Sequence, residues 1–322
     1  MKTEKEKIIE NLGLIDLLIC SSGFEDRSVQ LASSLDPSKI KDSIVFHLDD
    51  TYKVSSVNLE KIHEKIPQSR LIEYPKNSSL ETFDIFYNTF KEINSKNKGE
   101  MLNVVIDVTT FTREVILILI KVISLEAFVN FNSTIVYTPN ESYSVDDGQF
   151  WMTKGIREIR SIIGYSGLHS PSKKLMLIVL NGFDEERTEH IIECFEPDKI
   201  VLGKPNKSGS INPSLNLISC SRYDRIKEKY KNLISQEFEF SCVDINFTIK
   251  EVKKIIDNNT DYNIVISPLN NKVSTIAVAI SAIENEEVQV CYASANQYNI
   301  DTKCIASNYF LVYNFNDYLK DL

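Results

Sequence analysis

The chain of 322 residues carries 36 Lys and Arg against 45 Asp and Glu, which gives a net charge of −9. This balance argues against a broad nucleic-acid-binding face, because neutralising phosphates requires a concentration of Lys and Arg, but it leaves room for a small anionic ligand in a local basic pocket. The N-terminus has no apolar signal-peptide core and no apolar run reaches transmembrane length, so we expect a soluble cytoplasmic protein without membrane contacts.

The first half of the sequence alternates short apolar runs with amphipathic segments. The apolar runs predict strands at 14–20, 43–48, 71–74, 102–108 and 133–137. The other segments predict helices at 4–12, 25–35, 55–66, 80–93 and 112–125. Strands that alternate with helices predict βαβ units and parallel pairing.

The second half repeats this pattern after a connecting segment, in which 156–163 suits a strand or a short helix. Strands are predicted at 174–180, 199–202, 242–245, 264–266 and 288–292. Helices are predicted at 185–195, 222–236, 249–258 and 273–283. A last apolar run, 310–314, predicts an edge strand that is the counterpart of the segment near Ile159.

Three pairs of similar segments occur in the same order in the two halves. They are LLICSSGFEDR (17–27) and LIVLNGFDEER (177–187), NVVIDVTTFTRE (103–114) and NIVISPLNNKVST (263–275), and SYSVDD (142–147) and QYNIDT (297–302). Their offsets stay near 155–160 residues, which favours a duplicated unit over a chance likeness of strand-like runs. We therefore predict an α/β protein of two tandem Rossmann-like domains with mostly parallel sheets, at 1–138 and 173–322, joined by a connecting segment at 139–172.

Four polar stretches follow predicted strands and precede predicted helices, at 21–27, 107–113, 181–187 and 267–274. In an open α/β sheet, ligands bind beyond the carboxyl ends of the strands, where the strand order reverses. Helix N-termini at this edge attract anions. We therefore expect the ligand-binding residues of both halves in these four stretches.

The two Gly-Phe turns are acidic. Here Glu25 and Asp26 have two interpretations: they cap and charge-match a helix, or they accept hydrogen bonds from ribose hydroxyls or a base. Arg27 balances this charge and is a candidate partner of Asp107. The candidate ligand-binding residues of these turns are Ser22, Gly23 and Arg27 in the first half, and Asn181, Gly182 and Arg187 in the second.

The other two turns combine hydroxyls, amides and one cation at a helix start, which suits a phosphate or nucleotide. Their alternative interpretation is a capped helix with solvated polar residues. The candidates are Asp107, Thr109, Thr110, Thr112 and Arg113 in the first half, and Asn270, Asn271, Lys272 and Ser274 in the second.

The sequence contains no recognisable catalytic or metal-binding motif. The six Cys form no CxxC pair, and the four His are scattered, so we expect neither a metal nor a cofactor. His47 and His190 are isolated in the sequence and are expected to be surface or hydrogen-bonded core residues. Cys20 is expected to be a core thiol.

The turns at 107–113 and 267–274, within tandem Rossmann-like halves, resemble those of the CARF and SAVED sensor domains of prokaryotic antiviral defence. The resemblance implies binding of a nucleotide or cyclic oligonucleotide second messenger in a cleft between the halves. It also implies a protein partner that acts as the effector, or a homo-oligomer of this chain.

Two other functions stay open. One is an enzyme that processes nucleosides or nucleotides, such as a glycosidase or deoxyribosyltransferase-like protein, with Glu25 or Asp26 as nucleophile or base. The other is a scaffold subunit without a small ligand.

Overall fold

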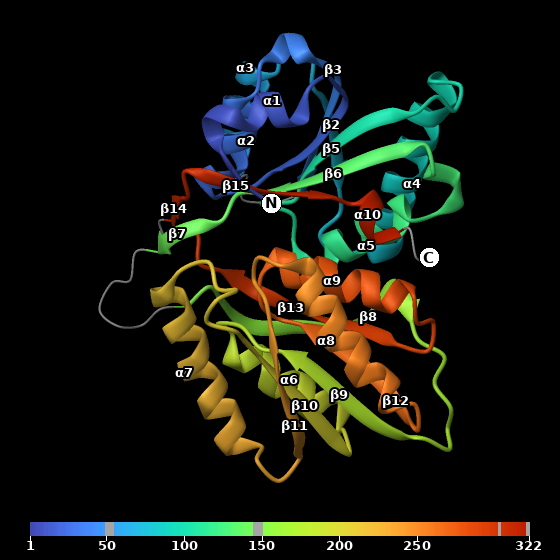
Figure 1. The fold of residues 1–322 in the computed structure, drawn as a ribbon, viewed down its shortest axis with the longest axis vertical. Coiled ribbons are helices and arrows are strands. Elements are labelled where there is room, and N and C mark those ends of the chain that lie inside the picture. Colours follow the sequence, from blue (N-terminus) through green and yellow to red (C-terminus); the bar gives the residue numbers. More distant parts are fainter. Residues whose placement is uncertain (49–54, 144–150, 302–303, 320–322) are drawn as a thin grey trace. The chain divides into compact units, whose positions relative to one another are not determined.

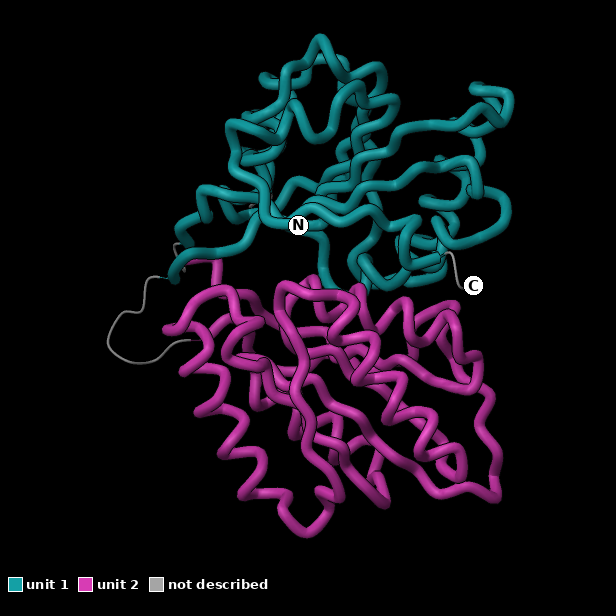
Figure 2. Tube along the Cα trace, viewed as in Figure 1, with its two compact units in different colours: residues 1–144, 303–322 teal, residues 145–302 magenta. Residues whose placement is uncertain are grey.

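The computed structural model describes residues 1–48, 55–143, 151–301 and 304–319 (Figure 1). The chain forms two compact units (Figure 2). Unit 1 contains Met1–Ser144 and Lys303–Leu322, whereas unit 2 contains Val145–Thr302. The second unit is therefore an insertion in the sequence of the first.

Unit 1 is built on a seven-stranded sheet with the order β1-β15-β6-β5-β2-β3-β4. Its strands are β1 (Lys2–Glu4), β2 (Ile15–Ser22), β3 (Ile40–Leu48), β4 (Arg70–Tyr74), β5 (Leu102–Asp107), β6 (Phe131–Tyr137) and β15 (Tyr309–Asn314). The strands from β6 to β4 are parallel to one another, and β15 is antiparallel to both β6 and β1.

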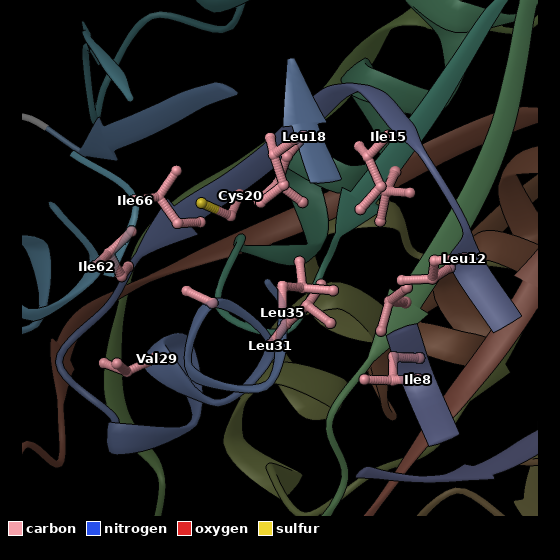
Figure 3. Packing of buried hydrophobic residues seen from close by; sticks show 14 of the residues in the cluster. Ile8, Leu12, Ile15, Leu18, Cys20, Val29, Leu31, Leu35, Ile62 and Ile66 are labelled. Carbon is pink, nitrogen blue, oxygen red and sulfur yellow. The ribbon is translucent and has the colours of Figure 1, made fainter. Parts of the chain in front are cut away.

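Helices cover both faces of this sheet. They are α1 (Ile8–Leu12), α2 (Gln30–Ser34), α3 (Ser56–Lys65), α4 (Ser79–Lys96), α5 (Arg113–Ile123) and the short α10 (Asn316–Leu319), with 3-10 turns η1 (Lys5–Lys7), η2 (Asp26–Val29), η3 (Pro37–Lys39) and η4 (Glu126–Phe128). Side chains of α1, α2 and α3 pack with Val45 on one face (Figure 3). The next residue, Phe46, points to the other face and packs against Phe86 of α4, with ring centroids 4.4 Å apart.

Unit 2 has a six-stranded sheet with the order β11-β10-β9-β12-β13-β8. Its strands are β8 (Thr153–Ser166), β9 (Lys174–Leu180), β10 (Lys199–Pro205), β11 (Ile234–Phe240), β12 (Tyr262–Pro268) and β13 (Gln289–Tyr298). The helices are α6 (Glu185–Phe195), α7 (Pro213–Lys229), α8 (Ile245–Asp257) and α9 (Lys272–Ile283). All pairs in this sheet are parallel except β13 with β8.

The two sheets share strand order and direction. In each, five parallel strands are followed by one antiparallel strand, β15 beside β6 in unit 1 and β8 beside β13 in unit 2. This confirms the predicted fold class of two Rossmann-like, mostly parallel α/β units. A common origin of the two halves by duplication stays a prediction.

In the sequence, the antiparallel strands β8 and β15 each lie next to the strands of one unit but pair with a strand of the other unit. Although β8 follows the strands of unit 1 in the chain, it pairs with β13 of unit 2, while β15 follows the strands of unit 2 and pairs with β6 of unit 1. Two short strands in unit 1, β7 (Asn140–Tyr143) and β14 (Cys304–Ala306), also pair with each other. The predicted boundaries 1–138, 139–172 and 173–322 therefore need correction, because the apolar run at 310–314 belongs to unit 1 and the connecting segment contains β8, a strand of the unit 2 sheet.

Two predicted elements of the second half are also wrong. Residues 242–245 were expected to form a strand, but they form the turn before α8 and its first residue. The strand is β11, which begins inside the segment predicted as a helix at 222–236. Because β11 is an edge strand, exposed Glu237 and Glu239 alternate with buried Phe238 and Phe240, and its first residues lack the apolar character of a central strand.

In the first half, the segment 25–35 is not one helix but a 3-10 turn followed by α2. Over the described ranges, no helix combines the length and apolar character needed to span a bilayer.

Candidate functional site

The candidate site in each unit lies at the carboxyl edge of the parallel strands. In unit 1 the chain passes from β2 to β3 on one side, whereas β5 pairs with β2 on the other side. In unit 2, β10 and β12 flank β9 in the same way. The strand order therefore reverses at β2/β5 and at β9/β12, and the four predicted turns follow these four strands.

Within each unit, the two turns are in close contact. A Cβ added to Gly23 would lie 2.6 Å from the Cβ of Thr110, and a Cβ added to Gly182 would lie 2.1 Å from the carbonyl oxygen of Leu269. Thr110 Oγ1 also donates a hydrogen bond to the carbonyl of Ser21 at 2.7 Å. These positions therefore require glycine because of close packing, since any side chain would displace the facing turn.

Several of the predicted ligand-binding side chains hold the turns together. Thr112 accepts a hydrogen bond from the backbone of Val115 at 3.3 Å and caps α5. Asn271 accepts from the backbone of Ser274 at 3.0 Å and caps α9. The hydroxyl of Ser274 is buried and donates to the carbonyl of Asn271. For these three residues, helix capping accounts for the sequence pattern.

The amide side chains on the unit 2 turns connect neighbouring segments. Asn270 Nδ2 donates to the carbonyl of Asn181 at 2.7 Å, and its Oδ1 faces Cys242 Sγ at 3.2 Å. Buried Asn181 accepts from the hydroxyl of Thr188 at 2.9 Å. These contacts fix the positions of the unit 2 turns relative to one another.

Asp107 is buried at the end of β5. Its Oδ1 accepts from the backbone N–H of Thr109 at 3.0 Å and from the Thr109 hydroxyl. Burial raises the pKa of Asp107 to about 6, although these hydrogen bonds oppose the rise. Arg27, which was a candidate partner of Asp107, forms its ion pair with Glu25 instead.

Unit 1 contains a buried arginine cluster, defined as Glu25, Arg27, Tyr137, Tyr143 and Cys304. Arg27 Nε donates to Glu25 Oε2 at 2.7 Å, and Nη2 lies 2.5 Å from the same oxygen. Its guanidinium lies 5.9 Å from the ring centroid of Tyr137, and Nη1 donates to the carbonyl of Thr138 at 2.9 Å. Cys304 Sγ is 3.4 Å from Glu25 Oε2. Burial, together with Glu25, raises the pKa of Cys304 to about 12.

The two carboxylates of the unit 1 turn have different environments. The Glu25 side chain is 15% exposed and is held by Arg27, whereas the Asp26 side chain is 77% exposed and lies 3.3 Å from Lys61 Nζ. Glu25 thus compensates a buried guanidinium, and Asp26 takes part in a surface ion pair of small energetic value.

Unit 2 contains a matching arginine cluster, defined as Thr153, Asp184, Arg187, Tyr292 and Tyr298. Arg187 Nε lies 3.0 Å from Asp184 Oδ2, and its guanidinium lies 5.7 Å from the ring centroid of Tyr292. The hydroxyls of Tyr292 and Tyr298 are 3.5 Å apart, and the Thr153 hydroxyl donates to Asp184 Oδ2.

The other acidic residues of the unit 2 turn also have partners. Glu185 pairs with Arg222 at 3.2 Å and with Arg225 at 2.5 Å. Glu186 accepts from the backbone N–H of Gly155 at 3.0 Å. The acidic sequence of this turn is therefore explained by contacts within the unit.

Sequence analysis missed the tyrosines of both clusters. Tyr143 and Tyr298 occupy the third pair of similar segments, and Tyr137 and Tyr292 are separated by the same 155 residues (292 − 137). That spacing was the signal available in the sequence. A second missed contact joins buried Ser22 to His47, whose Nδ1 lies 2.6 Å from Ser22 Oγ.

Unpartnered polar atoms gather at the carboxyl edges. Among the described residues, ten buried side-chain nitrogen and oxygen atoms have no hydrogen-bond partner, and six of them lie at these edges. The six are the hydroxyls of Thr138 and Ser267, both amide atoms of Asn140, and Nε and Nη2 of Arg187. Buried polar groups are normally satisfied. Arg187 Nε does lie 3.0 Å from Asp184 Oδ2, so the other five atoms are the ones that lack a close acceptor or donor in the described part of the chain.

The two predicted cations, Arg113 and Lys272, are the first residues of α5 and α9 and are partly exposed. A surface depression of about 460 Å³ lies elsewhere, along α8, and includes Lys250, Lys253 and Lys254 but none of the predicted site residues. In the part of the chain that the structure describes, no group of three His, Cys, Asp or Glu is placed to hold a metal ion.

Comparison with known proteins adds no relative. No protein-family model matches the chain, and no curated protein matches its sequence.

Proposed function

We propose that the protein is a binding module for a nucleotide-derived ligand, which each unit holds at the carboxyl edge where its strand order reverses. The observation that carries this proposal is a set of buried polar atoms without a hydrogen-bond partner: those of Thr138 and Asn140 beyond β6 in unit 1, and Arg187 Nη2 beyond β9 and the Ser267 hydroxyl at the end of β12 in unit 2. A buried polar group without a partner costs about 1–3 kcal/mol, so a ligand that supplies partners recovers that energy on binding.

The charges near the edges fit a ligand with both a polar base and a phosphate. Arg113 and Lys272 each stand at the start of a helix of 11 or 12 residues, where the helix dipole adds to the positive charge. The resemblance of these turns to CARF and SAVED domains supports the same class of ligand. On this proposal the protein is a sensor of a nucleotide or cyclic oligonucleotide in antiviral defence, and a partner chain is the effector.

Titration calorimetry of the full chain with mono-, di- and cyclic nucleotides tests the proposal. We expect micromolar or tighter binding of at least one of them, weakened by Arg113→Ala or Lys272→Ala. The matched controls are Lys39→Ala in unit 1 and Lys254→Ala in unit 2, both of which remove an exposed lysine away from the carboxyl ends of the strands.

Absence of heat with every nucleotide would count against the proposal, as would binding that survives both site substitutions. Chromatography of the same samples for released base or sugar tests the enzyme hypothesis with Glu25 and Asp26. Turnover that is lost in Glu25→Gln or Asp26→Asn would favour the enzyme over the sensor.

A further inference from the structure

The two arginine clusters differ in how their guanidinium groups are satisfied. Arg27 in unit 1 has a carboxylate, Glu25, on its Nε side and two neutral oxygens, from Thr138 and Tyr137, at Nη1. Arg187 in unit 2 also has a carboxylate near Nε. Its Nε lies 3.0 Å from Asp184 Oδ2 and its guanidinium lies beside Tyr292, but Nη2 is buried without a hydrogen-bond partner among the described residues, and the residue is only 1% exposed.

Strand pairing explains why a backbone carbonyl accepts from the arginine in unit 1, whereas none is seen to do so among the described residues of unit 2. Thr138 lies just beyond the end of β6, where its carbonyl accepts from Arg27. Its counterpart at the same offset of 155 residues is Ala293, which lies inside β13 and is paired with Ile159 of β8. The longer β13–β8 ladder therefore keeps this part of the backbone in the sheet.

The missing acceptor must be neutral rather than a second anion. Asp184 lies 3.0 Å from Arg187 Nε and already balances its charge. Another carboxylate or phosphate in this buried place would be uncompensated, which is unfavourable in a desolvated site. A carbonyl oxygen reproduces what Thr138 supplies to Arg27.

We propose that Arg187 reads the base of the ligand by donating from its Nη edge to the keto oxygen of a nucleobase. This rests on the proposed function and extends it to a class of base. Arg187 and Tyr292 are buried, whereas Thr153, Asp184 and Tyr298 of the same cluster are partly exposed and would be the first residues that a ligand meets. The Tyr292 and Tyr298 hydroxyls supply further polar contacts to the base.

Nucleotides that differ at one base position provide the test. IMP and UMP carry a keto oxygen where AMP and CMP carry an amino group. Titration of the unmodified full chain is expected to give at least about tenfold tighter binding for each keto nucleotide, since a hydrogen bond from a charged donor is lost with the amino one. This comparison needs no variant.

Arg187→Lys then assigns the preference to this residue, with Arg225→Lys, an exposed arginine of the same unit, as the matched control. We expect Arg187→Lys to remove the keto preference and Arg225→Lys to keep it, with far-UV circular dichroism as the check on folding.

Equal binding of keto and amino nucleotides would overturn the assignment and leave the proposed function standing. A keto preference that persists in folded Arg187→Lys would do the same. Binding of inorganic phosphate that Arg187→Lys abolishes would show an anion site and would also overturn it. Binding of no nucleotide at all would refute the proposed function itself.

Discussion

Removal of residues 308–322 is expected to unfold unit 1 while unit 2 stays folded. This truncation deletes β15, which lies between β1 and β6 in the unit 1 sheet. It removes the side chains of Phe310, Leu311, Tyr313 and Phe315, each no more than 5% exposed. No strand of the unit 2 sheet is lost, because β15 belongs only to the first sheet.

The size of the effect follows from these four side chains. Burying a large apolar side chain contributes about 1.5–3 kcal/mol, so four of them contribute about 6–12 kcal/mol, which is an upper estimate. The deletion also removes the pairing of β15 with two neighbours and leaves β6 as an unpaired edge. Since domains are stable by about 5–15 kcal/mol, most or all of the stability of unit 1 is lost.

Hydrogen exchange followed by mass spectrometry checks this prediction unit by unit. Peptides covering β5 and α5 are expected to lose protection, and peptides covering β9 and α9 are expected to keep it. The matched control removes only residues 317–322, because Asn316 still bonds to the backbone of Ser133 and Phe131. Full protection of β5 and α5 in the longer truncation would refute the argument that unit 1 needs β15.

Three further outcomes are expected from the geometry of the turns and clusters. Gly182→Ala should destabilise unit 2 by about 1–3 kcal/mol in thermal unfolding, because the new Cβ meets the Leu269 carbonyl; an unchanged melting temperature would contradict this close packing. Burial raises the pKa of Asp107 above its ordinary value to about 6. Protonation of Asp107 therefore contributes fully to the free energy of unfolding below about pH 4, and on the order of 3 kcal/mol of that free energy is lost as the pH rises through 6. Asp107→Asn should flatten the dependence of unfolding free energy on pH between 4 and 7, and an unaltered slope in urea titrations would count against the assignment. Iodoacetamide should modify exposed Cys194 well before Cys304, whose pKa is raised to about 12, and peptide mapping that finds the reverse order would be inconsistent with a protonated Cys304 thiol.

The sequence by itself determined the fold class and the position of the four turns. Apolar runs such as 174–180 and the Gly-Phe turns are local signals, because strand formation and close turn packing depend on neighbouring residues. Gly23 and Gly182 were expected to bind a ligand, and only the structure shows that they stand where two turns touch. The edge strand β11 was missed because its exposed face removes the apolar signal.

Only the tertiary structure decided which sheets β8 and β15 join and how the arginine clusters are satisfied. The apolar run at 310–314 predicts a strand but not the sheet that the strand joins, because strand character does not specify a distant partner. The structure shows that it pairs with β6 of unit 1. Glu25 and Asp184 each stand near an arginine in sequence, yet Arg27 also donates to a backbone carbonyl, whereas Nη2 of Arg187 has no hydrogen-bond partner among the described residues. The difference depends on the residue that follows the tyrosine of each cluster. Thr138 follows Tyr137 beyond the end of β6, whereas Ala293 follows Tyr292 inside β13 because it pairs with β8.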